Sequence, residues 1–411
     1  MSTFTAQRRG LRGRGGAIPL AAVALALAAG AALPAAPAPA AERPGGDTAA
    51  RGDRGAAEAA RAPRSAAEKR AARVKRKQRK RRRGARRQRP AYWGAWIGTQ
   101  LTGGQPPWDM SAVERFRELV GKAPSLLHFS APFALCARGP CEQYPFPRWE
   151  MATIRAYGAI PFFSWGSQSV PVPPDLDLPG YRLAAIAAGA HDEYIRRFAE
   201  GSRDWGHPYF LRFDWEMNGD WFPWGEHANG NSPGDYVRAW RHVRDIFRSV
   251  GANNATWVWC PYAHARLRFG GLARYYPGDE YVDWTCLDGF NWARNGVNPQ
   301  PWRSFDEIFA RTYRTLVRRL APGKPVMLAE MASGGGPRAK ARWLRDMFTQ
   351  LRTRYRRVRG LLWFEQVDRG VQWPITSSPA ATRAFARGIA QPGFQANRFQ
   401  ALAGAPILPP R

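Results

Sequence analysis

The chain has 411 residues and carries 62 Lys and Arg against 32 Asp and Glu, which gives a formal net charge of +30. Its six histidines show neither an HExxH motif nor another close spacing, so no metal site and no cofactor are expected.

Residues 1–41 have the pattern of a secretory signal peptide. Arginines between Arg8 and Arg14 precede an apolar run, Ala17 to Leu33, and small residues follow it. The run is short and alanine-rich for a permanent membrane span, so cleavage near Ala40 is favoured over an uncleaved anchor. The sequence therefore predicts a secreted or cell-wall-associated protein.

Residues 42–90 form a basic segment that contains the block KRKQRKRRRGARRQR. Aromatic and β-branched residues are almost lacking there, so the segment cannot bury a core and is predicted to be disordered. Behind a secretory signal, the expected partner of these charges is an anionic cell-wall polymer or a membrane surface, and no nucleic acid. A solvated linker without a dedicated partner is the alternative.

From residue 91 to residue 390, apolar or aromatic runs alternate with polar or amphipathic stretches. Strands that alternate with helices favour a parallel sheet, and eight such units in about 300 residues fit an α/β fold, the (β/α)8 TIM barrel. An open doubly wound sheet fits less well, because no glycine-rich phosphate loop follows the first strand. The expected strands are AYWGAWIGT, SLLHFSAPF, GAIPFFSWG, PYFLRFDWE, ATWVWCPYA, WTCLDGFNW, KPVMLAE and VRGLLWFEQ, and the expected helices include Ser111 to Val120, Ala190 to Gly201, Pro233 to Val250, Ser304 to Leu320 and Lys340 to Arg354.

The fourth predicted strand, Pro208 to Glu216, ends in a carboxylate. Strand alternation would send Arg212, Asp214 and Glu216 to one face, with Glu216 at the C-terminal end of the barrel, where TIM-barrel chemistry takes place. Asp214 is expected to form a buried ion pair with Arg212 that supports the site, in preference to a direct catalytic role. A solvated loop position for Glu216, among core tryptophans, is the alternative.

A second carboxylate, Glu330, ends the seventh predicted strand and precedes a glycine-rich loop. Retaining glycoside hydrolysis uses one carboxylic acid and one carboxylate nucleophile, held about 5 Å apart. A cationic neighbour such as Arg212 would keep Glu330 ionised, while burial and the Glu330 charge would keep Glu216 protonated. The two glutamates therefore predict a retaining glycosidase.

Side chains that suit a sugar follow several of the predicted strands, because indole faces and amides contact the C–H faces and hydroxyls of a pyranose ring. His128 and His264 are further candidates to line the cleft, each as readily structural as functional. The predicted substrate-binding residues are Arg212, Asn218, Trp221, Trp224, Asn291, Trp292 and Trp363, and Trp165 and Glu365 are placed at the same end of the barrel.

The four cysteines agree with export. Cys136 and Cys141 are expected to close a small loop near the cleft. Cys260 and Cys286 fall in neighbouring predicted strands. They are expected either to form a disulfide or to remain two buried thiols. The connectivity of the four is left open by the sequence.

Several segments, in the right order, resemble glycoside hydrolase family 26, whose best-known members are β-mannanases. The resemblance covers about residues 91 to 390 and implies a retaining barrel glycosidase with Glu216 as general acid/base and Glu330 as nucleophile. Arg212 matches an arginine that points into the barrel. The matching segments are RFDWEMNGDWFPW, WVWCPYA, YYPGDEYVDWTCLDGFNW, VMLAEMASGG and GLLWFEQVDRGVQWPI.

Two positions depart from the pattern of that family. Trp215 stands where a histidine usually precedes the acid/base, and Asn291, Trp292 and Ala293 occupy the neighbourhood of a tyrosine that usually hydrogen-bonds the nucleophile. Both departures concern contacts to the sugar or to the nucleophile. They therefore bear on mannan specificity more than on the type of reaction.

The sequence thus predicts a monomeric endo-1,4-β-mannosidase that acts on a polysaccharide substrate. A β-glucanase or xylanase of the same fold is the first alternative. A catalytically weak glycan-binding barrel is the second, although a pure binder needs no pair of glutamates. A basic cell-surface protein with an incidental barrel is the third. Residues 391–411 are expected to be a C-terminal tail that wraps the end of the domain.

Overall fold

The computed structural model describes residues 70, 72–74, 87–136, 140–263, 271–294 and 300–411. The predicted signal peptide, nearly all of the basic segment and His264 lie outside the described residues. Residues 88–411 belong to one compact unit. Within the described ranges, no helix combines the length and hydrophobicity needed to cross a bilayer.

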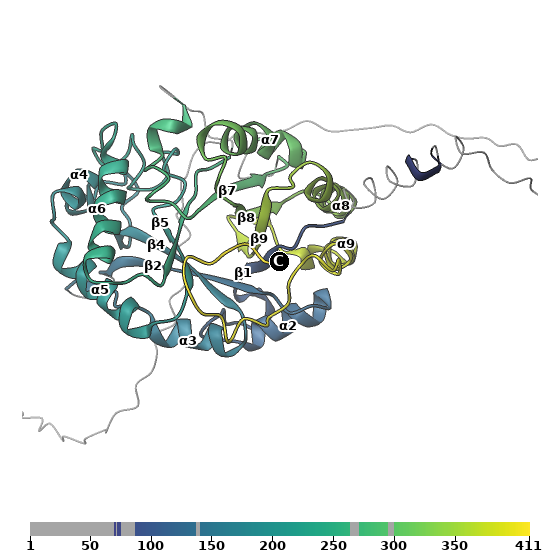
Figure 1. The fold of residues 1–411 in the computed structure, drawn as a ribbon, viewed down its shortest axis with the longest axis horizontal. Coiled ribbons are helices and arrows are strands. Elements are labelled where there is room, and N and C mark those ends of the chain that lie inside the picture. The colour runs from purple at the N-terminus through teal and green to yellow at the C-terminus, as the bar shows by residue number, and fades with distance from the viewer. Residues whose placement is uncertain (1–69, 71, 75–86, 137–139, 264–270, 295–299) are drawn as a thin grey trace, which may run out of the picture. The chain divides into compact units, whose positions relative to one another are not determined.

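A closed ring of parallel strands forms the centre of this unit (Figure 1). Each ring strand pairs with the next one along the chain, and β1 closes the ring by pairing with both β2 and β9. The predicted TIM barrel is therefore confirmed, with all of its predicted strands. In the described part of the chain, the eight ring strands are β1 (Tyr92–Ile97), β2 (Leu126–Leu135), β4 (Ile160–Val170), β5 (Tyr209–Phe213), β6 (Ala255–Trp259), β7 (Trp284–Asn291), β8 (Val326–Ser333) and β9 (Val358–Glu365).

Amphipathic helices surround the ring and bury one face each against it (Figure 1). The predicted helices are confirmed to within a few residues; α7 begins at a capping box of Ser304 and Glu307 and continues into a π-helical turn. The helices α3, α4 and α9 were not among the predictions. The bounds are α2 (Ser111–Val120), α3 (Arg148–Ala156), α4 (Leu183–Ala187), α5 (Asp192–Trp205), α6 (Asp235–Ser249), α7 (Phe305–Thr315), α8 (Pro337–Thr353) and α9 (Pro379–Ile389).

Two apolar layers hold the barrel together, because successive strand residues point to opposite faces. One layer fills the space between the strands and the helices, and large aromatic rings such as Trp165 and Phe198 stack there. The other layer fills the interior of the ring and includes Phe162, Phe210 and Met327. The interior is thus a packed core, and the polar site lies toward the C-terminal ends of the strands.

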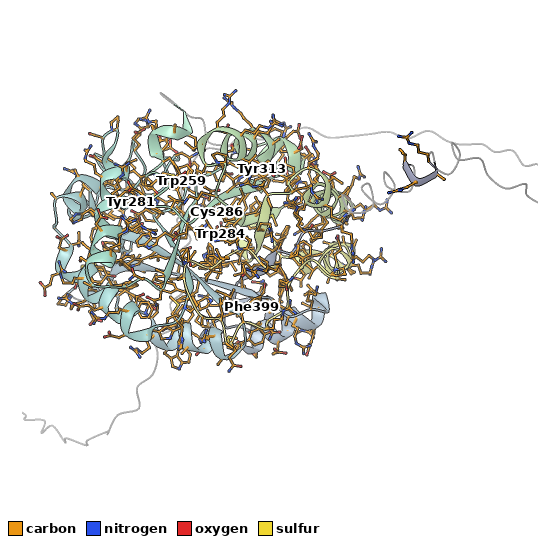
Figure 2. The ribbon with its side chains drawn as sticks, in the orientation of Figure 1. Trp259, Tyr281, Trp284, Cys286, Tyr313 and Phe399 are labelled. Atoms are coloured by element: carbon orange, nitrogen blue, oxygen red, sulfur yellow. A yellow bond between two sulfur atoms is a disulfide. The ribbon has the colours of Figure 1, made fainter. Side chains whose placement is uncertain are left out.

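The last residues of the chain close the opposite, N-terminal end of the ring. Ile407 is 2% exposed and belongs to the interior apolar layer. Its backbone carbonyl accepts from the Trp284 indole at 2.7 Å, and its N–H donates to the Thr256 hydroxyl at 2.8 Å. Trp284 lies near the centre of the ring in Figure 2. The segment expected as a tail, residues 391–411, therefore completes the barrel core.

Two disulfides are formed. Cys136 bonds to Cys141 at the end of β2, and Cys260 bonds to Cys286 between the adjacent strands β6 and β7. The second bridge encloses a sequence separation of 26 residues. A loop of that size corresponds to roughly 3 to 4 kcal/mol of stabilisation if the effect is loop-closure entropy in the unfolded chain.

Candidate active site

The loop that carries Glu216 leaves its strand earlier than strand alternation predicts. β5 ends at Phe213, and Asp214 and Glu216 then adopt positive φ angles of 39° and 56°. Left-handed backbone at residues other than glycine is uncommon and is concentrated at functional sites. A hydrogen bond of 2.7 Å from the N–H of Glu216 to the carbonyl of Cys260 holds this loop against the end of β6.

The predicted ion pair between Asp214 and Arg212 is wrong. The left-handed turn directs the Asp214 side chain to Ser167 of β4, whose N–H and hydroxyl donate to its two oxygens at 2.8 and 2.7 Å. Asp214 is fully buried, and burial raises its pKa to about 8 while the two hydrogen bonds oppose this shift. Asp214 therefore anchors the loop that carries Glu216 to the neighbouring strand.

Replacing Asp214 by asparagine should flatten the pH dependence of stability between about pH 4 and pH 8. Because the folded pKa is raised above that of the unfolded chain, the native protein binds the extra proton. The resulting stabilisation is complete below about pH 4 and is lost as pH rises toward 8. The slope removed is at most about 1.4 kcal/mol per pH unit. Urea unfolding of wild type and Asp214→Asn at several pH values measures it, and parallel curves would contradict the assignment.

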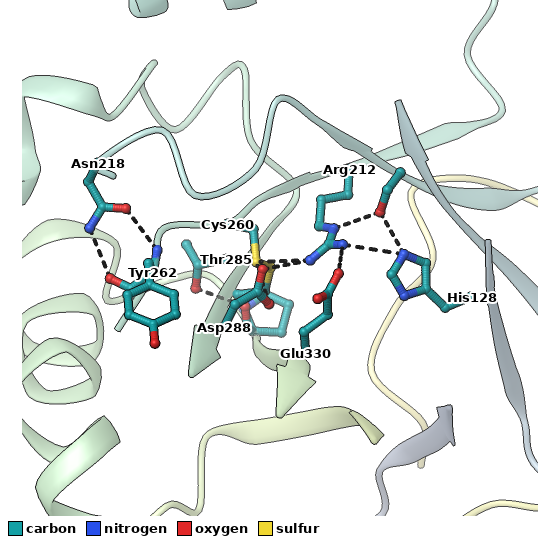
Figure 3. Close-up of a disulfide and its surroundings, with 11 residues drawn as sticks. His128, Arg212, Asn218, Cys260, Tyr262, Thr285, Asp288 and Glu330 are labelled. Atoms are coloured by element: carbon teal, nitrogen blue, oxygen red, sulfur yellow. Dashed lines mark hydrogen bonds and ion pairs between the residues drawn. A yellow bond between two sulfur atoms is a disulfide. The ribbon is translucent and has the colours of Figure 1, made fainter. Parts of the chain in front are cut away.

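Arg212 is the centre of a buried polar network inside the ring (Figure 3). Its guanidinium donates to Asp288 at 2.7 Å and to Ser164 at 2.7 Å, and it forms an ion pair with Glu330. The guanidinium carbon lies 4.8 Å from the centre of the Trp215 ring, within cation–π range. These contacts fix the orientation of the guanidinium group, so Arg212 holds a positive charge in a constant position beside Glu330.

His128 of β2 continues this network as a neutral acceptor. Its Nε2 lies 2.7 Å from the Ser164 hydroxyl and 3.3 Å from Arg212. Burial and the Arg212 charge lower the pKa of His128 well below its usual value, so the ring is uncharged. Because both neighbours of Nε2 are able to donate, the ring proton belongs on Nδ1. His128 therefore orients Arg212 through Ser164.

Glu330 reaches the interior because β8 is irregular. The pairing of β8 with β9 shifts register between Leu328 and Met331, both of which face the helices. The intervening bulge turns Glu330 toward Arg212 instead of following the strict alternation. Its side chain remains 13% exposed, whereas Arg212 is fully buried. Glu330 is thus the member of the pair that a ligand reaches from the open end of the barrel.

Asp288 of β7 shares Arg212 with Glu330. Asp288 is fully buried, and burial raises its pKa well above the usual range, with Arg212 opposing this effect. The hydrogen bond from Arg212 to Asp288 holds the guanidinium in its direction toward Glu330.

Glu216 occupies a more apolar environment than Glu330. It is 7% exposed and accepts a 2.6 Å hydrogen bond from the indole of Trp221. Burial, followed by the negative charge of Glu330, raises the pKa of Glu216 to about 8. Trp221 packs so close to Gly219 that a Cβ there would lie 2.5 Å from the ring, so only glycine allows this contact.

Asn218 holds the loop together and does not point its amide at open space. It donates to the carbonyl of Tyr262 at 2.9 Å and accepts from its N–H at 2.8 Å (Figure 3). The ring of Tyr262 lies edge-on to Trp221, with centroids 5.1 Å apart. The structure thus brings the loop after β5 and the loop after β6 together behind Glu216.

Two of the tryptophans predicted to contact substrate are core residues instead. Trp224 is fully buried, stacks on Phe222 and donates to the carbonyl of Trp215 at 2.6 Å. Trp363 is also fully buried and faces Phe385 in the helical layer, because its position on β9 points outward. The side chain of Trp165 has the same outward direction and is likewise buried.

Asn291 and Trp292 follow β7 but differ in accessibility. Asn291 is fully buried, donates to the hydroxyl of Ser333 at 2.9 Å and accepts from the N–H of Arg303 at 2.9 Å. Its amide therefore braces two loops and is not available to a sugar hydroxyl, contrary to the prediction. Trp292 is half-buried and packs edge-on against Trp373.

Three residues that sequence reasoning left out complete the site: Ser164, Tyr262 and Asp288. Asp288 lies in the sixth predicted strand, at even spacing from Trp284 and Cys286, whose side chains point into the barrel. This alternation could have identified Asp288 from the sequence. Ser164 and Arg212 are paired across β4 and β5, which only the strand register reveals. Tyr262 reaches the site through a loop contact that no periodicity predicts.

Comparison with known proteins agrees with this arrangement. The model of glycosyl hydrolase family 26 matches residues 192–329. Endoglucanase H of Acetivibrio thermocellus is 32% identical over 310 residues, which make up 72% of this chain and 30% of that protein. A mannan endo-1,4-beta-mannosidase of Caldalkalibacillus mannanilyticus is 32% identical over 123 residues, 28% of this chain and 20% of that protein. The chain thus spans less than a third of the length of these relatives.

A solved structure of a family 26 protein from Muricauda sp. is similar in fold, with a TM-score of 0.55 and 15% identity over 77% of this chain and 90% of that chain. At that identity the likeness concerns the barrel alone. The family match reaches further, because residues 192–329 include Glu216 and end directly before Glu330. The barrel of this chain is therefore similar to glycosyl hydrolase family 26, whose model matches residues 192–329.

Proposed function

We propose that this chain is a retaining glycoside hydrolase that cleaves β-1,4-linked polysaccharide. One observation carries the proposal: two glutamates beside one another in the barrel have different electrostatic surroundings. Glu330 forms an ion pair with Arg212, whereas burial and the Glu330 charge raise the pKa of Glu216 to about 8. A charged carboxylate and a protonated carboxylic acid are the two groups that a double displacement requires.

In the first step, a carboxylate oxygen of Glu330 attacks the anomeric carbon of the sugar. The bond from that carbon to the bridging oxygen breaks, and the bridging oxygen takes the proton of Glu216. The Trp221 indole, which donates to Glu216 at 2.6 Å, fixes the direction of the carboxyl group.

In the second step, Glu216 is a carboxylate and acts as the base. It takes a proton from a water molecule, whose oxygen bonds to the anomeric carbon while the bond to Glu330 breaks. This returns Glu330 to its ion pair with Arg212 and Glu216 to its protonated form. Both halves of the cycle therefore use the same two glutamates and release a sugar with unchanged configuration.

Trp221 and Trp292 are the proposed contacts to the sugar ring. Both indoles are half-buried, so each keeps an accessible part, and Trp221 already hydrogen-bonds the proposed acid. Asn218 is proposed to act indirectly, by holding Tyr262 in place. Trp224, Trp363 and Asn291 have no part in this proposal, because their side chains are buried and already in contact with other residues.

Two observations bear on the substrate class, and they favour different sugars. The sequence resemblance implies mannan, which is the first candidate. The second candidate is a β-glucan, because the alignment with Endoglucanase H spans 310 residues against 123 for the mannosidase. Reducing-sugar release from mannan, glucomannan, xylan and mixed-linkage glucan tests both. Release from none of these polymers would contradict the proposal.

Export is also proposed, on the sequence pattern of residues 1–41 and on the two disulfides. N-terminal sequencing of the protein recovered from the medium should give a chain that begins near residue 41. A chain that is retained in the cell and still begins at Met1 would contradict this.

A further inference from the structure

The N-terminal end of the barrel, opposite the glutamates, contains a hollow of about 400 Å³ that the proposed reaction does not use. It is lined by residues just before or at the start of β7, β8 and β9, together with the segment around Ile407. The packed interior of the ring, with Phe210 and Met327, lies between the hollow and the catalytic pair. The hollow is therefore separate from the active site.

Positive charge dominates the lining. The cations are Arg89, Lys324, Arg356, Arg357 and Arg359, and Asp283 is the acid among the lining residues. Asp283 already forms an ion pair with Arg244 at 3.2 Å and accepts from the N–H of Trp257 at 2.8 Å. The negative charge of Asp283 is thus paired with Arg244, which does not line the hollow.

Backbone carbonyls, not carboxylates, hold Arg357 and Arg359 in place. Arg359 donates to Pro90 at 2.6 Å and to Pro410, and Arg357 donates to Lys324 at 3.1 Å and to Pro322. Among the described residues, no carboxylate lies within ion-pair distance of Arg357 or Arg359. Carbonyls orient a guanidinium without cancelling its charge, so the hollow keeps a strong positive potential.

The crowding of these cations affects the pKa of one of them. Burial, followed by the like charge of Arg89, lowers the pKa of Arg359 below its usual value. Like charges held together in a concave surface are stabilised when an anion enters, and guanidinium groups match the geometry of phosphate oxygens. In addition, the run KRKQRKRRRGARRQR of the sequence ends at Arg89, which is one of the lining residues.

We propose that this hollow binds a phosphate-type oxyanion carried by a polyanion. Arg89, Arg357 and Arg359 would contact one phosphate group of the polymer. Because the hollow lies at the end of the barrel away from Glu216 and Glu330, a bound polyanion leaves the catalytic end free. The proposal is independent of the glycosidase assignment.

The test compares three full-length proteins: wild type, Arg89→Gln/Arg357→Gln, and a matched control, Arg338→Gln/Arg342→Gln. The control removes two exposed charges from α8 that lie outside the hollow. Binding of inorganic pyrophosphate and of long-chain polyphosphate is measured by calorimetry. The hollow variant should bind about tenfold more weakly, while the control binds like wild type.

Loss of affinity for both probes would support a site for the oxyanion group itself, and loss confined to the long chain would support a site for the polymer. Equal affinity of all three proteins for both probes would overturn the proposal, since the basic run is nearly intact in each. Arg89→Gln alone provides a second variant, because the structure assigns the Arg89 side chain no ion pair with a described residue. It should weaken binding without lowering the melting temperature, and unchanged binding would again overturn the proposal.

Discussion

Replacing Glu330 by glutamine is expected to abolish turnover, with a fall in kcat/KM on the order of 10⁴-fold or more. Glutamine has the size of glutamate, and its amide oxygen still accepts from Arg212, so the network of Ser164 and Asp288 around the guanidinium is kept. The amide cannot form the glycosyl ester. The loss should therefore appear in the rate and leave the melting temperature nearly unchanged.

The matched control for this variant is Glu118→Gln. Glu118 forms an exposed ion pair with Arg115 on α2, at 3.2 Å, and such surface pairs contribute little to stability. Initial rates on the substrate identified by the polymer screen give the comparison. If Glu330→Gln kept a tenth or more of the wild-type rate, Glu330 would not be the nucleophile.

Replacing Glu216 by alanine should reduce the rate by a factor that depends on the leaving group. Natural glycosidic oxygens need the proton of Glu216, and general acid catalysis typically contributes about 10² to 10⁴-fold. An activated aryl glycoside departs without protonation, so its glycosylation step should be largely spared. Steady-state rates and the initial burst of aryl alcohol measure the difference. An equal loss on both kinds of substrate would contradict the acid role.

The same residue should set the alkaline limit of activity. Burial and Glu330 raise the pKa of Glu216 to about 8, so the acid form is present below that pH and is lost as pH rises through it. The kcat/KM for a natural substrate should accordingly fall above about pH 8 in wild type and in Glu118→Gln. This limb should be missing from the profile of Glu216→Ala on the aryl glycoside.

The barrel could be predicted from the sequence because each strand is a short apolar run and each long helix has an amphipathic face. The start and end of α2 agree with the prediction, Ser111 to Val120, and the other long helices differ by a few residues. The contribution of residues 391–411 to the core was not predictable in this way. Its contacts, such as that between Ile407 and Trp284, join positions far apart in the chain.

Site residues could be predicted from the sequence where the type of the residue indicates its role. They could not be predicted where the local backbone conformation decides which way the side chain points. Arg212 and Glu330 were recognised from their type and position, and their ion pair is present. Alternation failed for Asp214, because a left-handed turn follows β5, and it also does not account for Glu330, because the bulge in β8 turns that side chain inward. Tryptophan content likewise predicted sugar binding but not which rings remain accessible.

The most direct test of the double displacement is the configuration of the first product. Proton NMR spectra recorded during the first minutes of hydrolysis distinguish the two anomers of the newly released reducing end before mutarotation mixes them. Attack by Glu330 followed by water activated by Glu216 predicts that the β anomer appears first and the α anomer grows in later. Initial appearance of the α anomer would contradict a mechanism in which these two glutamates act as nucleophile and acid/base.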